Sequence, residues 1–469
     1  MNGLALFGGE AMSRSATFLV AVIIAHRFGP IALGQYGFAL AVASVLLIVP
    51  DFGLHLLTTR ELVVEPERLR RIFWSLHWIK LLLVCGAAGS TVLFGQVIVQ
   101  DRVRRGLLYV LVARALLQSF SQSYMAIFKA FERMHYIALQ QLVGAALAVA
   151  CASVALVLRA SLFAVVSCLL VGQAAETWVG WQIVLRRLEP GEIYGWDTAF
   201  HRVMLAAAAP IGLTIALQAL NLRLDILSLS IFATNLNLGR FQAAAWFLIG
   251  TFLCVSLLMN VVFPRLSRLL ENPSERGRAY VESLLKNGSL LATVSSIVVW
   301  LGAPWILRWL YGPALSTSVD LLRILAPALP FVFLNTMLFY VFVAARRRAV
   351  YLGTLGWGVG IGILMSIGLA QRYGATGVAV ADLIREFLMT CVFLWHLKRD
   401  HLALKAGRGL LRVCLGVASL AVAFMVVAKA IRPAIAWTAS WELLMLGGTL
   451  TVVGLPTRRE LFLLVDETP

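Results

Sequence analysis

Charged residues are scarce in this chain of 469 residues. They make up 13% of the sequence, whereas hydrophobic residues make up 60% and the mean hydropathy is +0.87. In soluble domains the charged fraction is about twice as high, roughly 25%. The low charge excludes an ordinary soluble protein and predicts an all-α polytopic membrane protein.

Patterns typical of metal centres and disulfide frameworks are also missing. The six cysteines and seven histidines are scattered, without a CxxC or HxxxH pairing. All six cysteines fall in apolar segments and are expected to be small core residues. We therefore expect no bound metal and no cofactor. The first apolar segment lacks a basic n-region and an A-x-A cleavage site, so it is predicted to be a retained helix.

Acidic residues are fewer than basic ones, 23 against 40, which gives a formal charge of +17. Such an excess could indicate nucleic acid, but the basic residues form no patch interleaved with glycine and aromatic residues. Most of them flank apolar segments, where basic charge orients membrane helices. We predict membrane lipids, and no nucleic acid, as partners.

Fourteen apolar segments are long enough to cross a bilayer of about 30 Å. They lie near 4–26, 34–58, 74–98, 106–128, 136–158, 161–185, 203–233, 238–263, 287–310, 319–344, 350–371, 376–397, 410–430 and 436–455. Of the 40 basic residues, 24 follow even-numbered segments and 11 follow odd-numbered ones. This asymmetry predicts a multi-pass protein of the inner or plasma membrane with both termini in the cytoplasm.

An internal repeat relates the two halves of the chain. Segments beginning at Leu33 and Leu238 both open with Leu-Gly, a polar residue and an aromatic residue, and both place an arginine 26 residues after the glycine: Gly34 to Arg60, and Gly239 to Arg265. The repeat predicts two six-helix lobes, residues 1–190 and 191–400, facing each other across a central cavity. Residues 401–469 would add two helices and a cytoplasmic tail.

Charges inside the apolar segments are the candidate functional residues, because each one costs roughly 2.5–3.5 kcal/mol at the bilayer centre unless it has a partner or water. Glu10 and Arg14 are spaced i,i+4 and could form a structural ion pair, but Ser13 widens the polar surface and favours a cavity wall. Arg114 lies deep in the fourth segment without an acidic residue one turn away. We therefore expect Arg114 to bind an anion or to face a water-filled cavity.

The stretch "NLRLDILSL" (221–229) lies in the middle of the seventh segment. At 100° per residue, Gln218, Asn221 and Asp225 share a stripe with Ser228, and we predict that this stripe faces the cavity. Arg223 points away from the stripe unless Pro210 and Gly212 bend the helix. A structural pairing of Arg223 with an acidic residue of a neighbouring helix is the alternative.

Two further groups of charges have simpler interpretations. Asp382, Arg385 and Glu386 are spaced i, i+3, i+4 and are predicted to neutralise one another in a local structural network. Lys80 and Asp51 are placed near segment ends, so we expect their side chains to reach the membrane interface.

The buried arginines favour an anionic ligand. Arginine offers a planar fork of donors that matches phosphate oxygens, and it cannot lose its proton to escape burial. An exporter of cationic drugs would instead need a surplus of carboxylates in the cavity. Arg14, Arg114 and Arg223 are therefore predicted to bind an anionic ligand, with Glu10, Ser13, Asn221, Asp225 and Gln218 around them.

Several stretches carry a family resemblance. "RFGPIALGQYGFALAVASVLLIVPDFGLHLLTTRE" (27–61) resembles the opening helices of polysaccharide biosynthesis membrane proteins, the Wzx-type oligosaccharide flippases. "LDILSLSIFATNLNLGRFQAAAWF" (224–247) looks like their seventh-to-eighth helix connection. "MSRSATFLVAVIIAHRFG" (12–29) is similar to the first helix of the lipid II flippases. All belong to the multidrug/oligosaccharidyl-lipid/polysaccharide (MOP) exporter superfamily. Fourteen helices fit the lipid II branch, whereas the short "TNLN" connection departs from the pattern.

The resemblance implies alternating access and an isoprenoid-diphosphate-linked oligosaccharide as substrate. We predict a flippase, not an enzyme, that serves cell-surface polysaccharide assembly, for example of the O-antigen of lipopolysaccharide, with H+ or Na+ as the coupling ion and polysaccharide assembly proteins as partners. Two alternatives remain. One is a cation-coupled small-molecule exporter of the same fold, and the other is a membrane glycosyltransferase or polymerase acting on the same carrier, although no connecting segment is long enough for a catalytic loop.

Overall fold

The structure, a computed structural model, describes residues 2–97, 99–271 and 274–400, with side chains from Met12 onward except at position 14. Within these residues the chain is helical and contains no strand. Nine of the described helical stretches are long and apolar enough to cross a membrane. This agrees with the predicted all-α polytopic protein.

The chain divides into two compact units, residues 1–239 and 240–469. Unit 1 contains α1 (Asn2–Leu46), α2 (Ile48–Asp51), α3 (Leu54–Val64), a 3-10 turn (Pro66–Arg68), α4 (Leu69–Val97), α5 (Arg102–Ala130), α6 (Met134–Val157), α7 (Leu162–Arg187) and α8 (Thr198–Phe232). Helix α9 (Asn235–Glu271) begins in unit 1 and continues into unit 2. Unit 2 also contains α10 (Glu275–Tyr311), α11 (Val319–Leu325), α12 (Leu329–Ala344) and α13 (Arg348–Arg399), with 3-10 turns at Pro313–Ser318 and Ala326–Ala328.

The first twelve predicted segments all lie within this helical part of the chain. Two pairs of them are joined: α1 continues past a break at Gly29 (φ 78°), and α13 continues past a break at Gly374 (φ 58°). The last two predicted segments, 410–430 and 436–455, lie outside the described residues, as does the tail. A total of fourteen helices and a lobe boundary near residue 190 therefore stay predictions.

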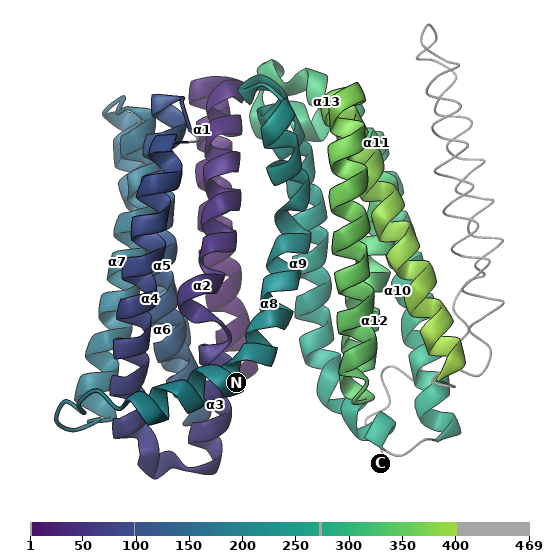
Figure 1. The fold of residues 1–469 in the computed structure, drawn as a ribbon. Helices are drawn as coiled ribbons and strands as arrows, with labels where there is room; N and C mark the ends of the chain where they lie inside the picture. Colours follow the sequence, from purple (N-terminus) through teal and green to yellow (C-terminus); the bar gives the residue numbers. More distant parts are fainter. Residues whose placement is uncertain (1, 98, 272–273, 401–469) are drawn as a thin grey trace, which may run out of the picture. The chain divides into compact units, whose positions relative to one another are not determined.

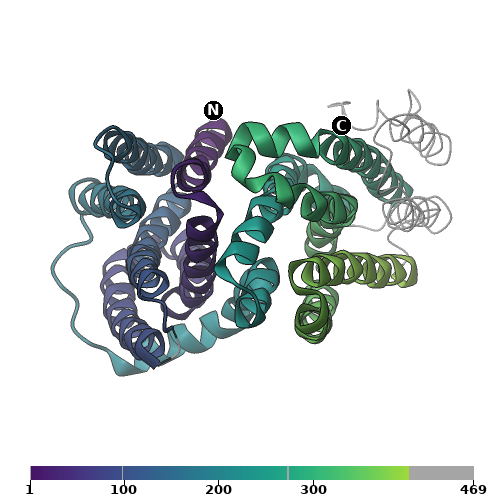
Figure 2. The same ribbon diagram turned by 90° about the horizontal axis from the view of Figure 1, so that it is seen from above.

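Unit 1 is a bundle in which α4, α5, α6 and α7 run alongside one another (Figures 1 and 2). Helix α6 packs against α7 and α1, and α5 packs against α1, α3 and α7. Large apolar side chains such as Phe73, Ile127 and Phe128 are fully buried at its centre. Close packing of this kind holds helices together in lipid, where the hydrophobic effect between helices is absent.

Side chains of α4 hold the connection between α7 and α8 in place. The backbone oxygens of Glu192 and Tyr194 accept hydrogen bonds from Arg70 Nε and Trp78 Nε1, both at 3.0 Å, and Arg71 Nη2 lies 2.7 Å from the Asp197 carboxylate. Asp197 also caps α8 by accepting a hydrogen bond from the Phe200 N–H. Figure 2 shows this connection running outside the helices of unit 1. The start of α8 is thereby positioned.

Unit 2 is built around α12, which packs against α10 and α13, while α11 packs against α10 and α13. Its apolar core contains fully or nearly fully buried aromatic residues, among them Tyr311, Phe331, Phe342 and Phe393. Three of these belong to α12 and α13. The core therefore fixes the two helices that carry the buried charged network of this unit.

The two glycines paired by the sequence repeat contact each other. A Cβ atom on Gly34 would overlap the carbonyl oxygen of Asn235, and one on Gly239 would overlap the carbonyl oxygen of Pro30. The backbones of α1 and α9 thus meet where the repeat places its glycines. Small residues allow such close approach of helices in membranes.

Asp101 ties the same region together. Its carboxylate accepts hydrogen bonds from Gln35 Nε2 (2.8 Å) on α1 and from Asn235 Nδ2 (3.0 Å) on α9, and it caps α5 by accepting from the N–H groups of Val103 and Arg104. Burial alone raises the pKa of Asp101, but the bonds from Gln35, the two N–H groups and Asn235 outweigh it and lower the pKa. A cap of this kind contributes about 1 kcal/mol.

The glycine crossing can be tested by Gly34→Ala. The added methyl group has no room, so the free energy of unfolding is expected to fall by about 1–3 kcal/mol, as in other overpacked sites. Thermal unfolding in detergent measures this. Gly89→Ala is the matched control, because nothing lies within 4 Å of the place that its methyl group would take and alanine favours the helix. Equal stability of the two variants would refute the crossing.

The lowered pKa of Asp101 predicts a pH dependence. A carboxyl group whose pKa is lowered by folding stabilises the protein above its unfolded pKa, about 3.9, and loses this contribution as the pH falls through the folded pKa. The unfolding temperature of Asp101→Asn should therefore lie below that of the unsubstituted chain near neutral pH, and the gap should shrink in acid. If the difference between the two unfolding temperatures does not change with pH, the charge of Asp101 does not contribute to stability.

Candidate functional site

A cluster of polar side chains from α1, α5 and α7 surrounds Arg114 in unit 1. Arg114 Nη2 donates a hydrogen bond to Thr17 Oγ1 (3.3 Å), and the fully buried Tyr36 hydroxyl donates to the Thr17 carbonyl oxygen (3.5 Å). The charge of Glu176 acts on Arg114. Glu176 is buried and accepts a hydrogen bond from Ser121 Oγ (2.7 Å). We call these five residues the arginine cluster.

Arg223 of α8 lies within electrostatic reach of the same cluster. The charges of both Arg114 and Arg223 act on the Tyr36 hydroxyl. Helix α8 is continuous from Thr198 to Phe232 with Pro210 inside it, and its ribbon changes direction along its length (Figure 1). The two arginines, 109 positions apart in the sequence, therefore lie in the same region of unit 1, near Tyr36 of α1.

The four residues of the polar stripe on α8 differ in how far they are buried. Asp225 and Ser228 are buried, at 8% and 6% exposure, whereas Gln218 and Asn221 are half-buried. On α1, the Ser13 carbonyl accepts a hydrogen bond from Thr17 Oγ1 (3.4 Å), so Ser13 lies one turn before the arginine cluster. The side chains of Glu10 and Arg14 lie outside the described residues, and their role stays a prediction.

A second cluster corrects the expectation for Asp51 and Lys80. Neither side chain reaches the membrane interface: Lys80 is 0% exposed and Asp51 3%. Lys80 Nζ lies 3.0 Å from Asp51 Oδ1 and also donates to the Ser119 carbonyl, and the other Asp51 oxygen meets His55 Nδ1. We call Asp51, His55 and Lys80 the aspartate cluster. The prediction that the side chains of Asp51 and Lys80 reach the interface was wrong.

The physical reason is a break in the segment that contains Asp51. Helix α2 ends at Asp51, Phe52 adopts left-handed backbone angles (φ 35°, ψ 37°), and α3 starts after Gly53 (φ 78°). Apolar length alone suggests one straight span, but the Pro-Asp-Phe-Gly sequence at 50–53 is a turn signal. That signal could have placed Asp51 at an internal break, where its carboxylate turns into the bundle.

An aromatic group next to Lys80 was not anticipated from the sequence. His77 Nδ1 lies 2.7 Å from the Phe73 carbonyl oxygen, and His77 Nε2 lies 3.1 Å from the Tyr124 hydroxyl. The imidazole stacks on Tyr124 and meets Trp181 edge to face. Because both ring nitrogens are engaged and aromatic rings surround it, His77 serves packing between α4, α5 and α7.

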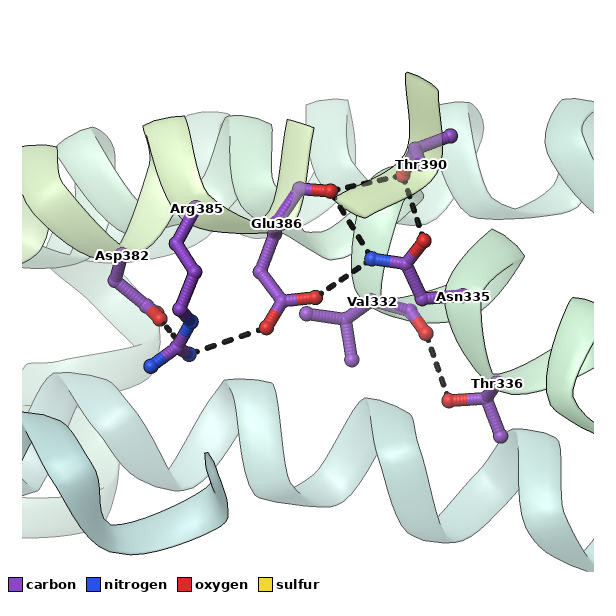
Figure 3. A network of polar contacts seen from close by, with 7 residues as sticks. All are labelled: Val332, Asn335, Thr336, Asp382, Arg385, Glu386 and Thr390. Atoms are coloured by element: carbon purple, nitrogen blue, oxygen red, sulfur yellow. Dashed lines mark hydrogen bonds and ion pairs between the residues drawn. The ribbon is translucent and has the colours of Figure 1, made fainter. Parts of the chain in front are cut away.

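The third polar group lies in unit 2, where α12 faces α13 (Figure 3). Arg385 Nη2 contacts the carboxylates of both Asp382 and Glu386, the latter at 3.1 Å. Asn335 Nδ2 donates to Glu386 Oε2 (2.8 Å), and Thr390 Oγ1 donates to Asn335 Oδ1 (2.8 Å). All five side chains are buried. The three charged residues do pair with one another, as their spacing predicted.

The polar groups offer charges and hydrogen-bonding atoms that could bind a ligand. Within the described ranges, no group of three or more His, Cys, Asp or Glu side chains could hold a metal ion. The arginine cluster combines fixed positive charge with hydroxyl groups, a set of donors that suits phosphate and sugar oxygens. The arginine cluster, the aspartate cluster and the unit 2 network, which consists of Asn335, Asp382, Arg385, Glu386 and Thr390, each contain acidic as well as basic side chains.

Comparisons with known proteins bear on the family and the fold of the chain. A sequence profile of the family described as "Polysaccharide biosynthesis protein" matches residues 1–270. A search of curated protein sequences finds no match.

Solved structures of membrane transporters share the fold. Lipid II flippase MurJ in an inward closed conformation superimposes with a TM-score of 0.72 at 14% identity, covering 95% of this chain and 96% of that chain. An inward-facing multidrug resistance MATE family transporter of the MOP superfamily gives 0.67 at 14% identity, covering 83% and 95%. A MOP superfamily transporter from Pyrococcus furiosus gives 0.57 at 13% identity, covering 85% and 94%. At these identities the likeness shows the fold alone.

The unit 2 network predicts that Arg385→Met is strongly destabilising. The substitution leaves two carboxylates buried without their counter-charge, and removing one partner of a buried ion pair costs about 3–5 kcal/mol. The free energy of unfolding in detergent measures the loss. Arg372→Met, at an exposed position of α13, serves as the control. Restoring stability by adding Asp382→Asn and Glu386→Gln would support the network, and a loss no larger than that of the control would contradict it.

Proposed function

The chain belongs to the polysaccharide biosynthesis protein family, and we propose on this basis that it is a flippase for isoprenoid-diphosphate-linked oligosaccharides. It would move the lipid-linked sugar from the cytoplasmic to the outer leaflet for cell-surface polysaccharide assembly. The family and the MOP fold were both expected from the sequence, and both are confirmed. The chain is accordingly a multi-pass membrane protein with a transporter fold.

The observation that supports a diphosphate substrate is the presence of two arginines near Tyr36. Arg114 and Arg223 carry two permanent positive charges on α5 and α8, both within electrostatic reach of the buried Tyr36. Such charges are costly in hydrocarbon and mark substrate pathways by default. A diphosphate offers two negative groups linked by a short bridge, which suits two guanidinium groups. Arg14 would join them from α1.

The remaining predicted site residues would serve the sugar and the coupling step. Asn221, Gln218 and Ser13 carry hydrogen-bonding groups for sugar hydroxyls, and Asp225 and Glu10 are carboxylates for hydroxyls or a coupling ion, H+ or Na+. The substrate would bind alternately from either side of the membrane as the protein shifts between two conformations. The charge of the connecting segments favours an inner or plasma membrane with both termini in the cytoplasm.

An exporter of small molecules with the same fold is the second candidate. It is favoured by the likeness to a multidrug resistance MATE family transporter, which is almost as strong as that to the lipid II flippase. It is also favoured by the carboxylates Glu176 and Asp225, which could attract a cation. A role as an enzyme is not proposed, because no segment that connects the described helices is long enough to carry a catalytic loop.

Flipping by purified protein in liposomes tests the proposal. With a fluorescent isoprenoid-diphosphate monosaccharide as the probe, Arg114→Ala and Arg223→Ala are each expected to slow flipping about tenfold or more, because a hydrogen bond between charged groups contributes about 1.5–3 kcal/mol. Arg114→Lys should recover part of the rate, since lysine keeps the charge but loses the planar fork. The initial rate of probe accessibility in the outer leaflet is the measurement.

Arg102→Ala is the matched control, because Arg102 lies on the same helix as Arg114 but at an exposed position. It should flip the probe at the rate of the unsubstituted chain. Rates in Arg114→Ala and Arg223→Ala equal to this control would refute the diphosphate role of the arginines. Transport of a cationic dye without any flipping of the probe would favour the exporter.

A further inference from the structure

The aspartate cluster is a buried charged group of unit 1 to which the proposed flippase mechanism assigns no role. One carboxylate, that of Asp51, is shared between two basic side chains: Lys80 on one oxygen and His55 on the other. Lys80 and Asp51 are enclosed, whereas His55 retains 24% exposure of its side chain. His55 also lies only five positions before the exposed Arg60. A proton can therefore reach the imidazole more readily than the other two groups.

The charge of the cluster depends on the protonation of His55. With a neutral imidazole, Lys80 and Asp51 balance each other. When the imidazole takes one proton from water, an N–H bond forms at its free ring nitrogen and the cluster gains one positive charge. Two cations then compete for one buried carboxylate, and an uncompensated charge inside a protein is costly. Histidine is the side chain that makes this change near neutral pH.

The surroundings contain few groups that could mask this change. On α4, the titratable neighbours are Lys80 itself and His77, whose ring nitrogens meet Phe73 and Tyr124. Helix α5 contributes the Ser119 carbonyl and, between Arg114 and Lys129, no titratable residue except Tyr124.

The other elements that pack against the break add nothing titratable nearby. The sequence between Tyr36 and Asp51 contains no such residue, and neither does α8 between Arg202 and Arg223. On α3, the next charged residues after His55 are Arg60 and Glu61. The charges that act on Asp51 are those of Lys80 and His55.

The aspartate cluster lies where a change in its charge can move one helix against another. Helix α2 has only four residues, and the strained left-handed Phe52 follows it. The Phe52 carbonyl oxygen lies so close to α8 that a Cβ atom on Gly212 would be 2.7 Å from it. Movement of α2 therefore pushes on α8 next to Pro210, and α8 carries Arg223 and Asp225.

We propose that His55 and Asp51 form a proton-binding site at the break between α2 and α3. Protonation of His55 draws Asp51 away from Lys80, loosens the tie between α2 and α4, and shifts the break against α8. Proton binding itself is independent of the transported substrate. The inference that this proton binding is coupled to the movement of a lipid-linked sugar rests on the proposed function.

Infrared difference spectra of the full-length protein in lipid nanodiscs test the binding step. Between about pH 5.5 and pH 8, the range in which histidine changes charge, the Asp51 carboxylate band is expected to shift. The shift should be lost in His55→Gln and in Asp51→Asn. It should persist in His135→Gln, the control, because His135 lies at an exposed position of α6. A shift that survives in His55→Gln overturns the proposal.

The flipping assay tests the coupling step with the same variants. The rate for the unsubstituted chain should change about threefold or more between pH 5.5 and 8, and the rate for His55→Gln should be flat. At pH 8, glutamine resembles the neutral imidazole, so equal rates there show that the variant is folded. If the band shifts but the flipping rate of the unsubstituted chain is independent of pH, the coupling is overturned. If nothing is flipped at any pH while the band still shifts, the proton site stands and the proposed function fails.

Discussion

The hydrocarbon of a bilayer offers no hydrogen bonds, and this constraint accounts for most of what the described structure contains. Backbone groups are satisfied within helices, and buried charges meet a counter-charge or a dipole. Lys80, with no exposed surface, has both Asp51 and the Ser119 carbonyl. Arg385 has two carboxylates. The polar groups gather in clusters because hydrocarbon cannot solvate them singly.

The same constraint makes irregular backbone informative. A left-handed phenylalanine between α2 and α3 is tolerated because the break packs against α4, α5 and α8. The break lies against the part of α8 that precedes Arg223, so the charged groups of unit 1 are linked through one continuous helix.

Sequence reasoning succeeded where local spacing determines contact. Asp382, Arg385 and Glu386 lie within four positions of one another on α13, so their pairing follows from helix geometry. It failed for Asp51 and Lys80, which are 29 positions apart and on different helices. Hydropathy treats 34–58 as one uniform segment and therefore places Asp51 near its end, although a turn interrupts the helix there. Sequence reasoning succeeded in part for Gly34 and Gly239. Their equivalent positions in the repeat could be seen in the sequence, but their contact with each other could not.

The class of the protein could be predicted from the amino-acid sequence alone, because the length and apolarity of the segments depend only on the thickness of the membrane. The family could be predicted too, through Gly, Pro and aromatic residues at fixed spacing. Which charges meet depends instead on tertiary packing. Arg114 and Arg223 come from helices far apart in the chain, and their common approach to Tyr36 requires the observed packing of α1, α5 and α8. Helical periodicity determines the face of a residue on its own helix, but the neighbour of that face is set by side-chain packing between helices.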